Sequence, residues 1–164
     1  MNVADALRSL ASPPRAHSKS STLLLVMLLA SFTNGCSPAS DIALAQQQVP
    51  RFHAMFNQGR TLDLYLQGSE DLRALTSQEQ FVGLLDAIRQ GYGAVKSTEQ
   101  ATSEMNYRSD GDFSGAFVTL LHNTTFADGA AIETFVFRIE DDAALLAGYH
   151  FTAKPAAKRT DETL

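Results

Sequence analysis

The chain has only one cysteine and no tryptophan among its 164 residues. A single thiol cannot form a disulfide within the chain, so the sequence excludes the class of small domains that depend on disulfides for stability. A domain of this length can instead be stabilised by its own hydrophobic core. Basic residues are also outnumbered, with 13 Lys and Arg against 18 Asp and Glu and a net charge of −5. This balance argues against nucleic acid as a partner, because binding to its phosphates needs a basic surface.

Long hydrophobic runs are missing as well. The most apolar stretch, Ser21 to Ala30, extends over about ten residues, whereas a helix that spans a bilayer needs about 20. Arg8, Arg15 and Lys19 precede this stretch, with Asp5 as the one acidic residue among them. A basic segment followed by a short apolar segment is typical of a secretory signal peptide. The sequence therefore predicts export.

The only cysteine, Cys36, follows this apolar segment. Asn34-Gly35-Cys36 resembles the bacterial lipobox, in which small residues precede a cysteine that is lipidated before the signal is cut, although Thr33 stands where that motif prefers Leu. The resemblance implies a lipid anchor on Cys36, and Ser37 after it resembles the signal for transfer to the outer membrane. One alternative is cleavage after Ala39, which would discard Cys36. Another is a buried hydrophobic helix with a core cysteine.

These features divide the chain into a signal peptide (1–35), a lipidated tether (36–40), a single domain (41–153) and a disordered tail (154–164). Within the domain, helical periodicity fills the first half and strand alternation the second. This order predicts an α+β fold, with N-terminal helices packed on one face of a curved antiparallel sheet.

Two longer helices and one short one are expected. Apolar residues spaced by three and four predict a helix over Asp41–Asn57, with a kink or a break near Gln46–Val49 because Pro50 lies inside it. A short amphipathic turn follows at Thr61–Leu66. A capping box of Thr76 with Glu79 then predicts a helix that ends before Gly91. Its buried stripe is Phe81, Leu84, Leu85 and Ile88.

The second half is punctuated by Asp110-Gly111, Asp128-Gly129 and Asp141-Asp142, and the two Asp-Gly pairs predict hairpin turns with positive φ angles. A polar stretch over Ala94–Arg108 predicts an edge strand or a bent pair of strands. The strand from Phe113 to His122 is apolar on both sides, which favours a central position. The last two strands have predicted inner faces of Phe135, Phe137 and Ile139, and of Leu145, Tyr149 and Phe151.

Helices followed by a bent antiparallel meander resemble the nuclear transport factor 2-like superfamily, a cone of curved sheet closed by a long N-terminal helix. The residues Thr124-Thr125-Phe126, Gly129, Glu133 to Phe137, Asp141-Asp142 and Gly148-Tyr149 are similar to those of an uncharacterised family of small exported bacterial proteins. Leu145 or Leu146 stands where those members usually carry a tryptophan. The resemblance implies the cone fold. Members of that superfamily include isomerases and dehydratases with an Asp, His or Tyr in the pocket, as well as proteins without catalysis.

Glu133 is the candidate catalytic residue. By strand parity it shares a face with Phe135 and Phe137, so its carboxylate points toward an apolar interior, where desolvation would raise its pKa and suit it to act as a general base. The alternative is a structural role at the strand end, as a backbone cap or as an ion-pair partner of Arg138. We favour the structural role because no second catalytic group is fixed by spacing.

The other candidate polar groups give no site. His53 is expected to face the interior as a half-buried, hydrogen-bonded side chain, whereas His122 and His150 are expected on solvated strand faces, and Tyr149 as aromatic packing with a wet hydroxyl. No metal-ligand spacing and no cofactor motif is present. We therefore expect no metal and no cofactor in a non-catalytic binding or interaction module of the cell envelope, on the periplasmic side of the membrane.

Three kinds of partner are compatible with this expectation. The first expected partner is the membrane, bound through the lipid on Cys36. The other two are a small apolar ligand and another envelope protein, which the domain itself would bind. One alternative is a small pocket enzyme, an isomerase or a lyase, that uses Glu133 as its general base. Another is a homodimer that associates through the open sheet.

Overall fold

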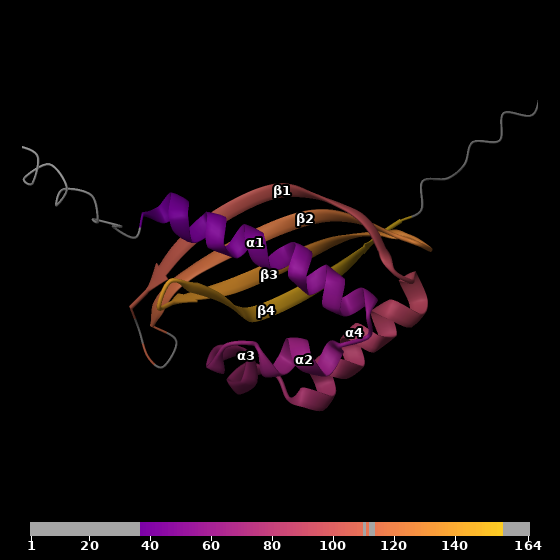
Figure 1. The fold of residues 1–164 in the computed structure, drawn as a ribbon, viewed down its shortest axis with the longest axis horizontal. Helices are drawn as coiled ribbons and strands as arrows, with labels where there is room; N and C mark the ends of the chain where they lie inside the picture. The colour runs from indigo at the N-terminus through magenta and orange to yellow at the C-terminus, as the bar shows by residue number, and fades with distance from the viewer. Residues whose placement is uncertain (1–36, 110, 112–113, 156–164) are drawn as a thin grey trace, which may run out of the picture. The chain divides into compact units, whose positions relative to one another are not determined.

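The computed structural model describes residues 37–109, 111 and 114–155. The predicted signal peptide, the predicted lipidation site Cys36, Asp110, Phe113 and the tail beyond residue 155 lie outside these ranges, so the predictions made for them are not tested. Four helices precede four strands (Figure 1). They are α1 (Pro38–Asn57), α2 (Thr61–Leu66), α3 (Glu70–Leu75), α4 (Gln78–Tyr92), β1 (Val95–Arg108), β2 (Gly115–Phe126), β3 (Ala130–Glu140) and β4 (Ala143–Lys154). The prediction of a mixed α+β fold is confirmed.

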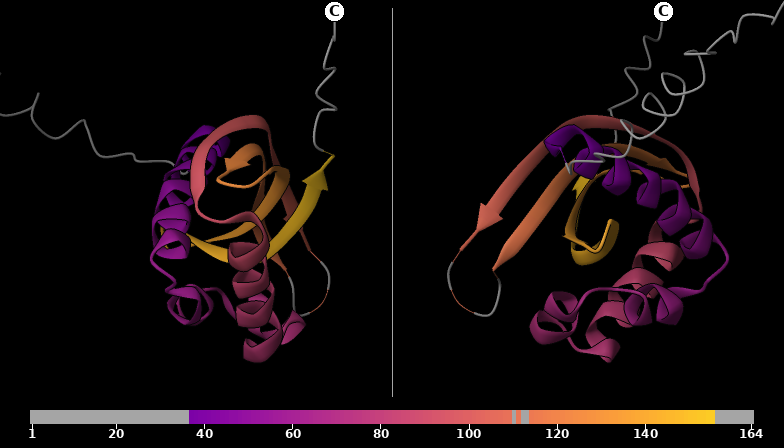
Figure 2. Two further views of the ribbon diagram at one scale, coloured as in Figure 1. Left: turned by 90° about the vertical axis from the view of Figure 1, so that its right-hand side faces the viewer. Right: turned by 60° about the vertical axis from the view of Figure 1, so that its left-hand side comes forward.

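The strands form one antiparallel sheet in the order β1-β2-β3-β4. They are strongly bent, and α1 runs diagonally across them (Figures 1 and 2). Helix α1 contacts all four strands, α2 contacts α1 and α4, and α3 contacts β4. The hydrophobic core lies between these helices and the sheet face that carries Val118, Leu120, Phe135 and Phe137. β1 is an edge strand, as predicted, with two register shifts against β2.

Helix α1 is longer than predicted. It begins at Pro38, and Ser37 and Ser40 form a capping box at its N-terminus, so part of the predicted tether is helical. The helix continues through Pro50 as one element. Of the two predicted alternatives, a kink or a break, the break is therefore wrong. Pro50 and Gln46 are both exposed. The Gln46 carbonyl that loses its intrahelical partner can therefore bond to water, which lowers the cost of a proline at this position.

For the other three helices, the sequence predicted α2 correctly, missed α3, and placed the N-terminal cap of α4 one residue too early. Helix α2 has the predicted bounds, and α3 was not predicted. The capping box of α4 is formed by Ser77 and Gln80, not by Thr76 and Glu79. The helix ends at Tyr92, and Gly93 follows it with φ of +74°. Leu84 is 43% exposed, so the buried stripe consists of Phe81, Leu85 and Ile88.

The tight turns differ in their backbone. Gly111, Asp141 and Asp142 have positive φ angles, whereas Gly129 does not. At Gly129 the reason for glycine is instead a close approach, since a Cβ there would lie 2.9 Å from the Tyr92 ring. The Asp128-Gly129 turn is thus where the sequence predicts it, but its positive φ was wrong.

The inner face of β3 is the predicted one, because Glu133, Phe135 and Phe137 are all buried. On β4 the prediction is wrong at Leu145. The register against β3 shifts there, so that Leu146 lies opposite Phe137 and Gly148 opposite Val136. One extra residue reverses the alternation. Leu146 therefore shares a face with Tyr149, and Leu145 lies opposite Arg138. Within the described ranges, no helix is both long and apolar enough to cross a membrane.

Candidate functional site

Glu133 lies at the centre of a group of hydrogen-bonded polar side chains, which we call the Glu133 cluster: His53, Thr98, His122, Thr124, Glu133 and Tyr149. Thr98 is exposed and Tyr149 is half-buried, whereas the other four are buried. The Glu133 side chain is 1% exposed. Its Oε2 lies 2.8 Å from His53 Nε2 on α1 and accepts a hydrogen bond from the Thr124 hydroxyl on β2. Its Oε1 accepts a hydrogen bond of 2.7 Å from the Tyr149 hydroxyl on β4. Both carboxylate oxygens are therefore held by donors from three different elements.

Opposing effects act on the pKa of Glu133. Burial raises the pKa. The hydrogen bond and charge of His53 and the hydrogen bonds from Thr124 and Tyr149 lower the pKa, and together they outweigh the effect of burial, so that the net shift is downward. Glu133 is therefore ionised at neutral pH. This corrects the expectation of a raised pKa, because that expectation considered burial without the donors. Burial, the charge of Glu133 and their hydrogen bond raise the pKa of Tyr149, so its hydroxyl stays protonated and donates.

The ionised carboxylate fixes the direction of the hydrogen bonds that lead away from it. A carboxylate can only accept, so the single hydroxyl proton of Thr124 points to Glu133. Thr98 Oγ1, 3.0 Å from Thr124 Oγ1, must then donate to Thr124. It must in turn accept from His122 Nδ1, which is also 3.0 Å away. The sequence of donors therefore places the proton of His122 on Nδ1.

His122 completes the cluster as a neutral imidazole. Burial and the nearby charge of His53 lower its pKa, and the charge of Glu133 opposes them only in part. With the proton on Nδ1, Nε2 carries a lone pair. That atom is buried and has no hydrogen-bond partner among the residues that the structure describes. The predicted solvated position of His122 is therefore wrong, since its side chain is 6% exposed.

The sequence predictions for Arg138, Tyr149 and His53 have mixed outcomes. Arg138 does not pair with Glu133, because it lies 3.0 Å from both Asp71 oxygens and forms an ion pair of 2.6 Å with Glu140. The hydroxyl of Tyr149 is bound to Glu133, so the expected wet hydroxyl is wrong. His53 faces the interior as predicted and is buried.

His150 is exposed, as expected. The signal for His53 was available in the sequence, since it lies four residues after Val49 and three before Phe56, on the buried stripe of α1.

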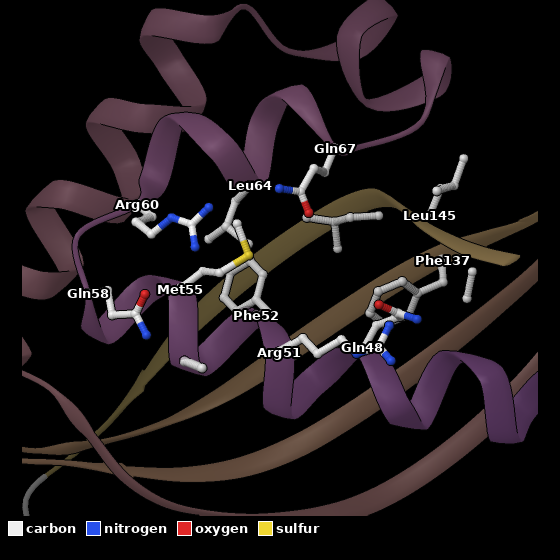
Figure 3. A pocket seen from close by; sticks show the side chains of 13 residues that line it. Gln48, Arg51, Phe52, Met55, Gln58, Arg60, Leu64, Gln67, Phe137 and Leu145 are labelled. Carbon is white, nitrogen blue, oxygen red and sulfur yellow. The ribbon is translucent and has the colours of Figure 1, made fainter.

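A separate pocket of about 590 Å³ lies between α1, α2 and the start of β4 (Figure 3). Its apolar lining consists of Phe52, Ala54, Met55, Leu64, Phe137, Ala144, Leu145 and Leu146. Its polar lining consists of Gln48, Arg51, Gln58, Arg60 and Gln67. The described lining residues include two arginines and no carboxylate. This pocket could not be predicted from the sequence, because its walls come from segments about 100 residues apart.

Phe52 links the pocket to the Glu133 cluster. Its ring lines the pocket and stacks on Tyr149 at a centroid distance of 5.1 Å, and it packs edge-on against Phe135 at 5.1 Å and His53 at 5.9 Å. None of the cluster residues is among the described residues that line the pocket. A ligand in the pocket would therefore meet an aromatic wall and not the carboxylate.

In the described part of the chain, no three His, Cys, Asp or Glu residues come together as ligands. The pocket offers apolar side chains, amides and guanidinium groups, which suit an organic ligand.

Comparison with known proteins gives a family but no activity. No curated protein matches the chain. A family model described as "Protein of unknown function (DUF4019)" matches residues 49–149, a range that includes the second half of α1 from Val49, all of the Glu133 cluster and most of the pocket. The chain belongs to the DUF4019 family.

Proposed function

We propose that this protein is a non-catalytic binding module of the cell envelope, exported and held by a lipid on Cys36 at the periplasmic side of an outer membrane. The basic and apolar segments before Cys36 and the small residues beside it support export and anchoring. We further propose that the fold is a nuclear transport factor 2-like cone. The bent antiparallel sheet and the long N-terminal helix that crosses it support this proposal (Figure 1).

The pocket is the single observation that carries the binding function. Its volume of about 590 Å³ falls within the range of about 300–1,000 Å³ that is typical of sites for small organic ligands. Its centre is apolar. Its polar groups are the neutral amides of three glutamines and the positively charged guanidinium groups of two arginines, which can orient a ligand (Figure 3). These are the properties expected of a site that binds a small molecule without changing it.

The Glu133 cluster favours a structural role over the alternative of an isomerase or a lyase. A general base needs a carboxylate that can reach a substrate proton and has a pKa near the working pH. Glu133 has a lowered pKa, and donors occupy both of its oxygens. We infer that Glu133 connects α1 to β2 and β4 through His53, Thr124 and Tyr149, and so holds the helix on the sheet.

Purification from the native source tests this proposal. Native mass spectrometry should detect a co-purified small molecule, and an Ala54→Phe variant should lose it because the new ring enters the pocket. Ala54 is exposed on α1 and lines the pocket, so the substitution should not disturb the core. Ala87→Phe is the matched control, since Ala87 is exposed on α4 and is not among the pocket residues. Retention of the same ligand by Ala54→Phe would contradict the proposed site.

A further inference from the structure

We propose that the ligand of the pocket is an amphipathic carboxylate, with an apolar chain among Phe52, Met55 and Leu64 and its anionic group at Gln48 and Arg51. This inference rests on the proposed binding function and adds the chemical class of the ligand. It is based on the charge of the pocket, on the position of one arginine and on the size of the cavity.

The charge of the pocket is opposite to that of the chain. The protein has a net charge of −5, yet the described pocket lining contains Arg51 and Arg60 and no acidic residue. A concave site whose charges are all of one sign concentrates the field and attracts ions of the other sign. An anion is thus favoured over a cation, and the apolar centre favours an anion that carries hydrocarbon.

Arg51 is the more available of the two arginines. It is exposed on α1 and has no ion pair with any carboxylate of the described chain. Arg60 is partly engaged, because its Nε lies 2.7 Å from Asp63. Gln48 lies three residues before Arg51 on the same helix, and Figure 3 shows the two side chains together at one end of the pocket.

A guanidinium group and an amide at this position can bind the two oxygens of a carboxylate. The guanidinium group supplies parallel N–H donors in a planar fork, and the amide adds a neutral donor. From this end the remaining lining extends along α1, where Phe52 and Met55 follow within four residues, toward Leu64 on α2. The flexible thioether of Met55 suits an aliphatic chain of variable shape.

The size of the cavity sets the size of the ligand. At about 30 Å³ for each water-sized group, about 590 Å³ holds on the order of twenty such groups. Decanoate, a simple aliphatic carboxylate, is smaller than this limit and is a suitable probe. Decan-1-ol keeps the chain and removes the charge, and decyltrimethylammonium reverses the charge.

Isothermal titration calorimetry with these three probes tests the proposal. Decanoate should bind at least about tenfold more tightly than decan-1-ol, its affinity should fall at high salt, and decyltrimethylammonium should bind least. Arg51→Gln should weaken decanoate binding about five- to twentyfold and leave decan-1-ol unchanged. Lys96→Gln, which removes an exposed positive charge on β1 outside the described pocket lining, should change neither.

Three results would overturn all or part of the inference, and they are separable from failure of the proposed function. If decanoate and decan-1-ol bind equally, and Ala54→Phe weakens both, the pocket binds apolar ligands and only the assigned carboxylate class is wrong. If none of the probes binds, the carboxylate class is also wrong, while the mass spectrometric test of co-purified ligand still decides the binding function. Unchanged decanoate affinity in Arg51→Gln would contradict the assigned anion position.

Discussion

Replacing Glu133 with glutamine tests the structural role of the cluster directly. The amide has nearly the shape of the carboxylate, so the substitution removes charge and leaves packing unchanged. Its oxygen can accept from His53 and Thr124 in place of Oε2, and its NH₂ group then faces Tyr149, whose hydroxyl must turn to accept. The three hydrogen bonds thereby lose their ionised partner.

The magnitude follows from the balance between this loss and the relief of a buried charge. A hydrogen bond to a charged group contributes about 1.5–3 kcal/mol, against about 0.5–1.5 kcal/mol for a neutral one. Burial of the carboxylate offsets part of the difference, but the lowered pKa of Glu133 shows that the folded protein favours the ionised form overall. We expect Glu133→Gln to lower the free energy of unfolding by about 1–3 kcal/mol, and the melting temperature by about 4–10 °C.

The assay is urea and thermal unfolding at neutral pH, followed by circular dichroism. Glu99→Gln is the matched control, because Glu99 is exposed on β1, and it should lie within about 0.5 kcal/mol of the wild type. A Glu133→Gln variant as stable as the wild type, or more stable, would refute the assigned role.

The pH dependence provides an independent test of the same residue. The folded-state pKa of Glu133 is lowered from its ordinary value of 4.5, so unfolded Glu133 binds protons more readily than folded Glu133. Its stabilising effect is therefore present above about pH 4.5 and is lost as the pH falls through the folded-state pKa. The difference between the wild type and Glu133→Gln should shrink in this acidic range. A difference that grows on acidification would contradict the direction of the shift.

Three further predictions concern other residues. The wild type should gain stability as the pH rises from the lowered folded-state pKa of His122 toward its ordinary value of 6.5, because unfolded His122 binds the proton more readily. His122→Phe should reduce this slope in urea unfolding, and an unchanged slope would argue against a neutral His122. Phe135→Ala should cost about 3–5 kcal/mol in the same assay, since the ring is fully buried, and a wild-type melting temperature would contradict the assigned inner face of β3. Cys36→Ser should release the protein from the membrane without unfolding it; an intact mass that corresponds to an unmodified chain starting at Ser40 would contradict the lipid anchor.

Local patterns predicted the elements of this fold better than their faces. Strand alternation identified the inward direction of Glu133, because Phe135 and Phe137 share its parity and the other face is less apolar. On β2 both faces are apolar, so parity could not decide which one meets α1, and His122 was assigned to the wrong side. On β4 the extra residue between Leu146 and Gly148 reverses the alternation, and nothing in the local sequence marks it.

The partners of Glu133 could not be predicted for a different reason. His53 is separated from Glu133 by 80 residues, and the contact exists only because α1 crosses the sheet at this point. The nearest basic residue on β3, Arg138, was the obvious partner by spacing, but Asp71 on the unpredicted helix α3 binds it instead. The effect of burial on the Glu133 pKa was foreseen, whereas its net sign depends on donors that only the tertiary structure supplies.

Methyl NMR during a titration with decanoate tests the central claim, that the pocket is a ligand site, most directly. The protein offers reporters both inside and outside the site. Met55 and Leu64 line the pocket, whereas Leu75 and Leu84 are exposed hydrophobic residues that are not among its described lining. We predict saturable shift changes and contacts from the decanoate chain at Met55 and Leu64, both lost in Ala54→Phe. Changes confined to Leu75 and Leu84, or equal changes in Ala54→Phe, would contradict the account.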